Sequence, residues 1–192
     1  MPNLPPWGAR EPRLGNNPLV IAVPRADGHV VLDMAMSQFS YGTLEAYQQR
    51  HEQLPFFGGF DEEGLLTRDP AAIEATARPL PIGFWKGSGL SLLLDMMAAL
   101  LSGGSATHEI AADSHNETRL SQTFIALNVS ALGESRKDLA DQIIAHMKSA
   151  VPSGNGEIRY PGERTLATRK ENMKLGIPVE PSVWKEIQQT SI

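Results

Sequence analysis

The sequence predicts an α/β layered fold, on the basis of three observations. Short runs of apolar, β-branched residues alternate along the chain with longer segments of helical periodicity. The chain has 192 residues, enough to bury a sizeable core. Its content of 41% hydrophobic and 20% charged residues is ordinary for a globular domain. We therefore expect a single domain over residues 1–192.

Three segments are predicted to be strands. Residues 19–23 and 30–34 are apolar, β-rich runs, and residues 24–28 between them contain Pro24 and Gly28. We expect two buried strands joined by a turn. Residues 123–129 alternate in the manner of a third strand.

Helices are predicted where helical spacing or terminal signals occur. Asp69 and Pro70 form an N-cap and first-turn pair for a short helix over 71–77. An almost wholly apolar run over 90–101 predicts a buried helix that ends at Ser102-Gly103-Gly104. Further helices are expected over 41–53, 135–149, 166–175 (with Gly176 as its stop) and 181–189 (with Trp184 directed inward), and loops over 55–65 and 106–122.

The most distinctive stretch, Pro81-Ile-Gly-Phe-Trp-Lys-Gly-Ser-Gly89, immediately precedes the apolar helix. Its glycines allow backbone to approach a ligand, and Lys86 beside the first turn of a helix favours an anion. Trp85 offers a flat face for a ring. These features suit a nicotinamide dinucleotide. A glycine-rich connector with a surface lysine and a packing tryptophan explains the composition equally well.

Two common nucleotide-binding motifs are not matched. A P-loop requires Gly-Lys-Ser/Thr in that order, whereas Lys86 precedes Gly87. A Rossmann fingerprint requires a third glycine or alanine where this chain has Leu92. Neither of these folds is therefore supported.

Five ordered motifs resemble those of the malate/L-lactate dehydrogenase-like oxidoreductases, which bind NAD(P) on a non-Rossmann fold. These motifs are Pro5 to Pro18 with Gly-Asn-Asn-Pro, Val31 to Ser37 followed by Phe39-Ser-Tyr-Gly42, Gly58 to Gly64, Phe84 to Gly89, and Tyr160-Pro-Gly-Glu163. The resemblance covers essentially the whole chain. It implies a layered α/β fold with a mixed sheet that lacks the family's N-terminal part. The chain would then be the C-terminal, cofactor-binding portion of a longer reductase.

The resemblance also implies an activity. The amino-acid sequences of the Phe-Ser-Tyr-Gly and Phe-Trp-Lys-Gly-Ser-Gly motifs are similar to those of one group of family members. These members transfer hydride from NADH to a 2-oxo sugar acid, converting 2,3-diketo-L-gulonate to 3-dehydro-L-gulonate. The family's proton-donating histidine lies in a Ser-His-Gly motif that is not found here, so no catalytic residue is assigned to this chain. A homodimer and a cytoplasmic location are expected for the full-length protein. Two alternatives stay open: a non-catalytic fragment that binds NAD(H) or assembles with a separate N-terminal part, and a malate/lactate-type 2-hydroxy acid dehydrogenase.

The resemblance assigns cofactor contacts to three stretches. They are His29, Val30, Val31, Leu32, Asp33, Met34 and Ala35; Trp85 and Lys86; and Gly162, Glu163 and Arg164. An acid at the end of a strand can accept hydrogen bonds from ribose hydroxyls and repels the extra phosphate of NADP. For Asp33 the alternative is a turn cap or a pair with an arginine. Arg164 can form a forked contact with a phosphate.

Composition argues against several other classes. The net charge is −5 with no basic patch, so nucleic acid is not an expected partner. The apolar run over 90–101 is too short to span a bilayer, and no signal peptide is visible. Zero cysteines exclude disulfides and fit a reducing compartment. His108-Glu109 followed by His115 lacks the His-Glu-x-x-His spacing, so no metal site is expected.

Asp95 lies within the apolar helix and needs an explanation. A carboxylate in apolar surroundings must be paired, hydrogen-bonded or protonated. It either has a structural partner, which is the more common case, or serves as an acid with a raised pKa.

Overall fold

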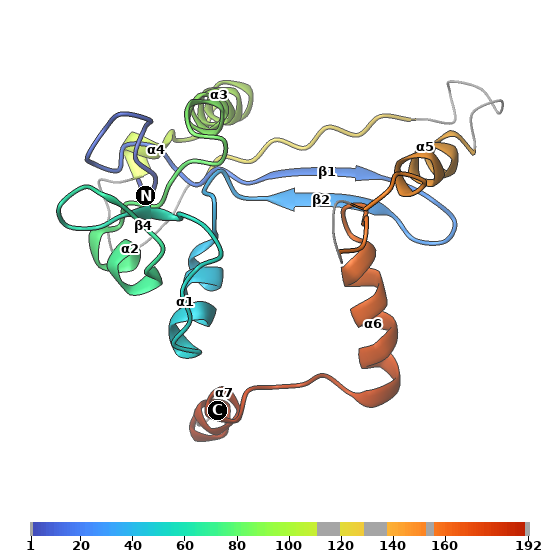
Figure 1. The fold of residues 1–192 in the computed structure, drawn as a ribbon. Helices are drawn as coiled ribbons and strands as arrows, with labels where there is room; N and C mark the ends of the chain where they lie inside the picture. The colour runs from blue at the N-terminus through green and yellow to red at the C-terminus, as the bar shows by residue number, and fades with distance from the viewer. Residues whose placement is uncertain (1, 111–119, 129–137, 153–155, 191–192) are drawn as a thin grey trace. The chain divides into compact units, whose positions relative to one another are not determined.

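The computed structural model describes residues 2–110, 120–128, 138–152 and 156–190 (Figure 1). The expected α/β class is confirmed. The elements are β1 (Leu19–Val23), β2 (Val30–Met34), α1 (Tyr41–Gln49), β3 (Gly59–Phe60), β4 (Leu66–Thr67), α2 (Pro70–Thr76), α3 (Trp85–Ser102), α4 (Thr107–Ile110), α5 (Leu139–Lys148), α6 (Glu163–Leu175) and α7 (Pro181–Gln189). In the described residues the strands form two two-stranded sheets, β1 with β2 and antiparallel β3 with β4, rather than one mixed sheet.

The chain folds as two compact units. The first contains Met1–Val20 and Asp33–Asn128, and the second contains Ile21–Leu32 and Val129–Ile192. The β1–β2 hairpin leaves the first unit after Val20 and returns to it at Asp33, so its residues are divided between the two.

Buried apolar side chains of the first unit form two small clusters. One consists of Leu4, Leu14 and Met36, and the other of Leu44, Leu54 and Ile73. Leu4 and Leu14 exchange backbone hydrogen bonds of 3.0 Å in both directions, which closes the N-terminal loop over the first cluster. α1 and α2 pack together around the second cluster.

The predicted helix ends are confirmed where local chemistry sets them. The Asp69 carboxylate accepts a hydrogen bond of 3.0 Å from the N–H of Ala71 at the start of α2. Gly103 and Gly176 follow α3 and α6 with φ of 67° and 92°, in the left-handed region that glycine adopts without strain. The bounds of α7 agree with the prediction.

Several boundaries differ from the prediction. α1 ends at Gln49 because the chain turns into the left-handed region at His51, with φ of 55°. α3 and α6 each begin earlier than expected, at Trp85 and Glu163. The expected loop over 55–65 contains β3, and the loop over 106–122 contains α4. The helix expected over 135–149 is α5, and its residues 135–137 lie outside the described residues.

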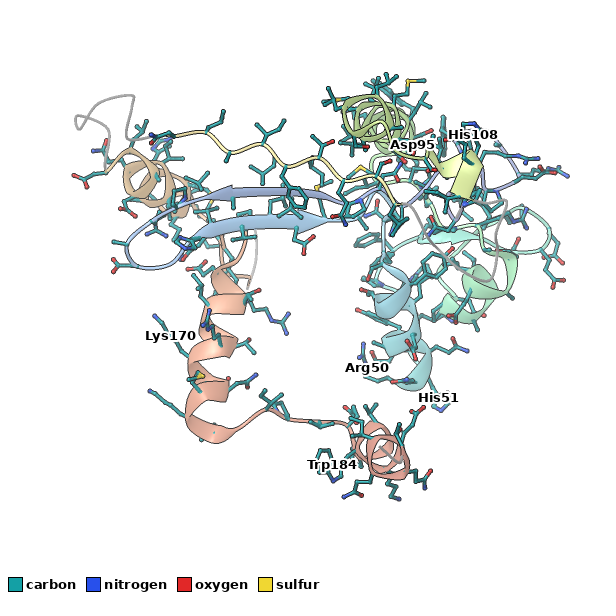
Figure 2. All side chains as sticks on the ribbon, turned by 180° about the vertical axis from the view of Figure 1, so that it is seen from behind. Arg50, His51, Asp95, His108, Lys170 and Trp184 are labelled. Carbon is teal, nitrogen blue, oxygen red and sulfur yellow. The ribbon has the colours of Figure 1, made fainter. Side chains whose placement is uncertain are left out.

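Four predictions of burial or pairing are wrong. β1 is largely exposed, with Ile21 at 52%, and β2 is only partly buried. The helix expected to be buried, α3, has Leu100 at 81% exposure. No strand forms over 123–128, and residue 129 lies outside the described residues. Trp184 on α7 is 51% exposed rather than inward (Figure 2). An apolar pattern indicates that a segment is stabilised by burial, but burial requires a second surface to pack against. The described residues do not provide that surface.

Candidate functional site

Two of the three expected cofactor stretches adjoin in the second unit. The N–H of Val31 on β2 donates a 3.1 Å hydrogen bond to the carbonyl oxygen of Pro161. Gly162 follows with φ of +88°, and a Cβ there would lie 3.1 Å from the Val31 nitrogen and 3.5 Å from the His29 carbonyl oxygen. The turn can therefore approach β2 this closely only because residue 162 is glycine.

Glu163 begins α6 and fixes the same turn. One carboxylate oxygen forms an ion pair with Lys148 at the end of α5, and the other accepts the N–H of Tyr160 at 3.3 Å. The hydrogen bond from Lys148 is the main reason that the pKa of Glu163 is lowered from its ordinary value of 4.5. The carboxylate is thus ionised and already engaged with the protein.

Tyr160 is flanked by two cations. The guanidinium carbon of Arg25 and the ammonium nitrogen of Lys148 each lie 5.4 Å from the centroid of its ring. Arg25 also forms an ion pair with Asp141 of α5, and this hydrogen bond is the main reason that the pKa of Arg25 is raised. The β1–β2 turn, α5 and the Tyr160–Gly162 turn are therefore linked through charged side chains.

An open pocket of about 700 Å³ lies beside this turn. It is lined by Lys148, Ala150, Pro152, Gly156, Glu157, Ile158, Arg159, Glu163, Arg164 and Ala167. Arg159 pairs with Glu157 at 2.8 Å, and Lys148 pairs with Glu163. Arg164 forms no ion pair among the described residues, so it leaves the lining with one unneutralised positive charge.

Trp85 and Lys86 belong to the first unit, in the first turn of α3 rather than in a loop before it. The Lys86 nitrogen lies 6.0 Å from the centroid of the Trp85 ring, and Trp85 is 66% exposed. The ring of Phe84, which precedes the helix, contacts that of Trp7 with centroids 5.1 Å apart. The N–H of Trp7 also donates to Ser88 Oγ at 3.0 Å. Trp7 and Phe84 were not among the predicted site residues, although both lie in motifs that carried the resemblance.

The glycines of this stretch differ in their surroundings. Gly83 has φ of +59°, which fits the turn before the helix. A Cβ on Gly87 would lie 2.2 Å from the carbonyl oxygen of Ile82, so this glycine allows the chain to pack against itself. Gly89 lies within α3 and has nothing within 4 Å of a Cβ position.

The expected residues at the end of β2 lie in the first unit. Asp33 is exposed, and its carboxylate has neither an ion pair nor a side-chain hydrogen bond in the described part of the chain. The alternative of a turn cap or an arginine pair is therefore not observed for Asp33. Met34 is partly buried and packs against the cluster of Leu4, Leu14 and Met36.

Asp95 has structural partners, in agreement with the more common of its two explanations. Its carboxylate accepts hydrogen bonds from the backbone N–H and the hydroxyl of Thr107, at 3.0 and 2.8 Å. Thr107 is the first residue of α4, and Figure 2 shows Asp95 and His108 on these neighbouring helices. Among the described residues, no three histidine, aspartate or glutamate side chains are grouped as a metal site, and His115 lies outside them.

The chain belongs to the malate/L-lactate dehydrogenase family, whose sequence profile matches residues 1–188. It is 46% identical over 188 residues to the 2,3-diketo-L-gulonate reductase of Escherichia coli O6:K15:H31 (strain 536 / UPEC). That match covers 96% of this chain and 56% of the relative, so the chain spans little more than half the length of the curated relatives it matches.

Solved structures agree with this membership. The malate dehydrogenase of Pyrococcus horikoshii OT3 aligns with a TM-score of 0.82 and 28% identity, covering 98% of this chain and 53% of that one. The sulfolactate dehydrogenase of Methanocaldococcus jannaschii aligns with a TM-score of 0.78 and 27% identity, covering 96% and 54%. None of the helices in the described part of this chain combines the length and apolar character needed to cross a bilayer.

Proposed function

We propose that this chain provides the cofactor-binding part of an NADH-dependent reductase that converts 2,3-diketo-L-gulonate to 3-dehydro-L-gulonate. The observation that carries the proposal is the 46% identity to Escherichia coli 2,3-diketo-L-gulonate reductases over 96% of this chain. Membership of the malate/L-lactate dehydrogenase family supports the broader class of hydride transfer to a 2-oxo acid.

The residues of the second unit fit a cofactor that carries phosphates. The pocket of about 700 Å³ lies within the size range of small-molecule sites, and Arg164 is its cation without an ion pair among the described residues. A guanidinium can hold a phosphate through two parallel hydrogen bonds. Glu163 contributes by holding the turn, since its carboxylate already bonds Lys148 and the N–H of Tyr160.

In the first unit, Asp33 and Lys86 are the charged residues proposed to contact the cofactor. The carboxylate of Asp33, which has no ion pair in the described part of the chain, is suited to accept hydrogen bonds from ribose hydroxyls and repels a further phosphate, which favours NAD over NADP. Lys86 supplies a positive charge at the first turn of α3. When bound, NADH supplies the hydride, while the residues of this chain bind and orient it.

The substrate assignment rests on relatedness. The malate dehydrogenase of Pyrococcus horikoshii OT3 is 28% identical to this chain, against 46% for the Escherichia coli reductases, which favours the sugar acid over malate or lactate chemistry. A panel of 2-oxo acids assayed with the complete protein discriminates between these substrates. Preference for oxaloacetate or pyruvate over 2,3-diketo-L-gulonate would replace the substrate assignment and leave the family unchanged.

The cofactor proposal is tested by titrating the chain with NADH and following tryptophan emission. Saturable quenching is expected, and Arg164→Ala should weaken the affinity at least about tenfold, because a charge-assisted hydrogen bond contributes about 1.5–3 kcal/mol. Arg169→Ala is the matched control, since Arg169 is an exposed arginine of the same helix that does not line this pocket. Absence of quenching from a folded chain would refute an independent cofactor site and favour an assembling fragment.

A further inference from the structure

Arg25 lies in the turn between β1 and β2, and little of its side chain is exposed. The exposed fraction of that side chain is 12%, against 53% for Asp141 of α5, with which it forms an ion pair. Nε donates to an Asp141 carboxylate oxygen at 2.5 Å, and Nη1 donates to the Gly28 carbonyl oxygen at 3.4 Å. A guanidinium has five donors in a fixed plane, so one arginine can hold both acceptors at once. Arg25 therefore ties the β1–β2 turn to α5.

Arg25 also contacts both of the adjoining stretches that are proposed to bind the cofactor. Its backbone N–H donates to Nδ1 of His29 at 3.3 Å, immediately before β2. Its guanidinium carbon lies 5.4 Å from the centroid of the Tyr160 ring, two residues before Gly162. A cation–aromatic contact is stronger where water is excluded, and the Arg25 side chain is largely covered. Arg25 thus links the start of β2 to the turn that precedes α6.

The position of Arg164 depends on how this turn sits against the β1–β2 hairpin. The N–H of Val31 donates to the Pro161 carbonyl oxygen at 3.1 Å, which joins β2 to the turn. A Cβ on Gly28 would lie 2.5 Å from Cδ1 of Leu166, so the hairpin turn is packed directly on α6. Arg164 lies between Pro161 and Leu166 in the chain and lines the open pocket. A movement of the turn relative to β2 therefore also moves Arg164.

The charges around Tyr160 favour a positioning role for Arg25 over a direct contact with the ligand. Arg25 and Lys148 both lie 5.4 Å from the centroid of the Tyr160 ring, and each forms an ion pair with an acid of the second unit. Because the paired carboxylate repels a phosphate, neither cation is well suited to hold one. Arg164 lines the pocket without an ion pair among the described residues, so it is the better suited cation.

We propose that Arg25 is a positioning residue of the cofactor site, which holds the turn over residues 160–162 against β2 and so places Arg164 for a phosphate of the ligand. It acts through Tyr160 and through the β1–β2 turn rather than by touching the ligand. Without Arg25 the turn would have to be ordered when the ligand binds, and that ordering lowers the affinity. The inference rests on the proposed function, because the site that Arg25 serves is the proposed NADH site.

The first test compares the NADH affinities of Arg25→Met and Arg50→Met by tryptophan quenching. Arg50, at the end of α1 in the first unit (Figure 2), is a matched control. It too pairs with an acid, Glu52 at 3.0 Å, and lies 4.7 Å from the centroid of a tyrosine ring, that of Tyr47. We expect Arg25→Met to weaken the affinity about three- to tenfold, and Arg50→Met to leave it within about twofold of wild type. Equal losses in the two variants, or no loss in Arg25→Met, would overturn the proposal.

A double-mutant cycle shows whether Arg25 acts through Arg164. If Arg25 places Arg164, the loss of affinity caused by Arg25→Met should largely disappear in the Arg164→Ala background, because the group being placed is absent. Additive losses would overturn the proposal, since they would mean that Arg25 contacts the ligand or acts independently of Arg164. Circular dichroism establishes that each variant is folded under the conditions of the titration, so that a smaller folded population is not counted as a weaker affinity.

A third measurement needs no ligand. Hydrogen exchange of the Val31 amide reports on its bond to Pro161, and Arg25→Met should accelerate this exchange about threefold or more while Arg50→Met leaves it unchanged. If Arg25→Met does not fold, Asp141→Asn removes the acid from α5 without altering the hairpin, and it should act in the same direction. Unchanged Val31 exchange in the folded variant would overturn the proposal. A wild-type chain that binds no NADH, with Val31 exchange accelerated in the variant as expected, would contradict the proposed function alone.

Discussion

Gly87 and Gly89 provide a matched pair of alanine substitutions within one helix. A Cβ on Gly87 would lie 2.2 Å from the carbonyl oxygen of Ile82 and 2.9 Å from its nitrogen, so the backbone itself must move. The N–H of Gly87 also donates to that oxygen at 2.8 Å, and this bond is strained by the same movement. At Gly89 a Cβ meets nothing within 4 Å.

The two substitutions should therefore have effects of opposite sign. Alanine is about 0.8–1.0 kcal/mol more favourable than glycine inside a helix, so Gly89→Ala should stabilise by up to about 1 kcal/mol. At Gly87 this gain is outweighed by overpacking, and we expect a net loss of about 1–3 kcal/mol. Urea denaturation followed by circular dichroism measures both, with unchanged slope indicating that only stability differs. Equal stabilisation by both alanines would refute the packing role of Gly87.

Three further predictions concern titration and buried hydrogen bonds. Lys148 lowers the pKa of Glu163, so their ion pair contributes stability that is present above pH 4.5 and is lost as the pH falls through the lower folded-state pKa. In Lys148→Met, carboxyl NMR should show the pKa of Glu163 returning toward 4.5. An unchanged pKa would exclude Lys148 as the cause of the shift. Asp95→Ala should lower the free energy of unfolding by about 1–2 kcal/mol in urea denaturation, because its hydrogen bonds to Thr107 are lost. NADH affinity should not change. A changed affinity would indicate that Asp95 has a role beyond structure. Burial raises the pKa of Tyr41 above 10.0, so its contribution to folding stability is present below pH 10.0 and is lost as the pH rises through the folded-state pKa. Tyr41→Phe should remove this loss of stability at alkaline pH, as measured by denaturation at a series of pH values. A loss of stability that persists in the variant would point to another titrating group.

The sequence could predict those features that are determined by neighbouring residues. Asp69 as an N-cap and Gly103 and Gly176 as helix stops depend on contacts within a few residues, and the structure has them as expected. The contacts around Tyr160 could not be predicted in this way. Arg25 and Asp141 are 116 residues apart, and no local spacing signals their ion pair.

Burial was the feature that sequence patterns predicted least well. The apolar run of α3 was expected to be buried, yet hydrogen bonds at Ser91 and Asp95 turn its polar side inward. Hydrophobic periodicity indicates that a segment favours burial, but it does not show which surface the segment packs against. Of the stretches predicted to contact the cofactor, β2 and the turn at Gly162 adjoin in the second unit, whereas Trp85 and Lys86 belong to the first.

The most direct test of the proposed cofactor site is an amide NMR titration of the isotope-labelled chain with NADH. The account predicts saturable shifts at Val31, Gly162 and Arg164, where β2 meets the turn that precedes α6. The same shifts should be reduced in Arg164→Ala and retained in Arg169→Ala. Saturable shifts confined to other parts of the chain would contradict the placement of the cofactor at this turn.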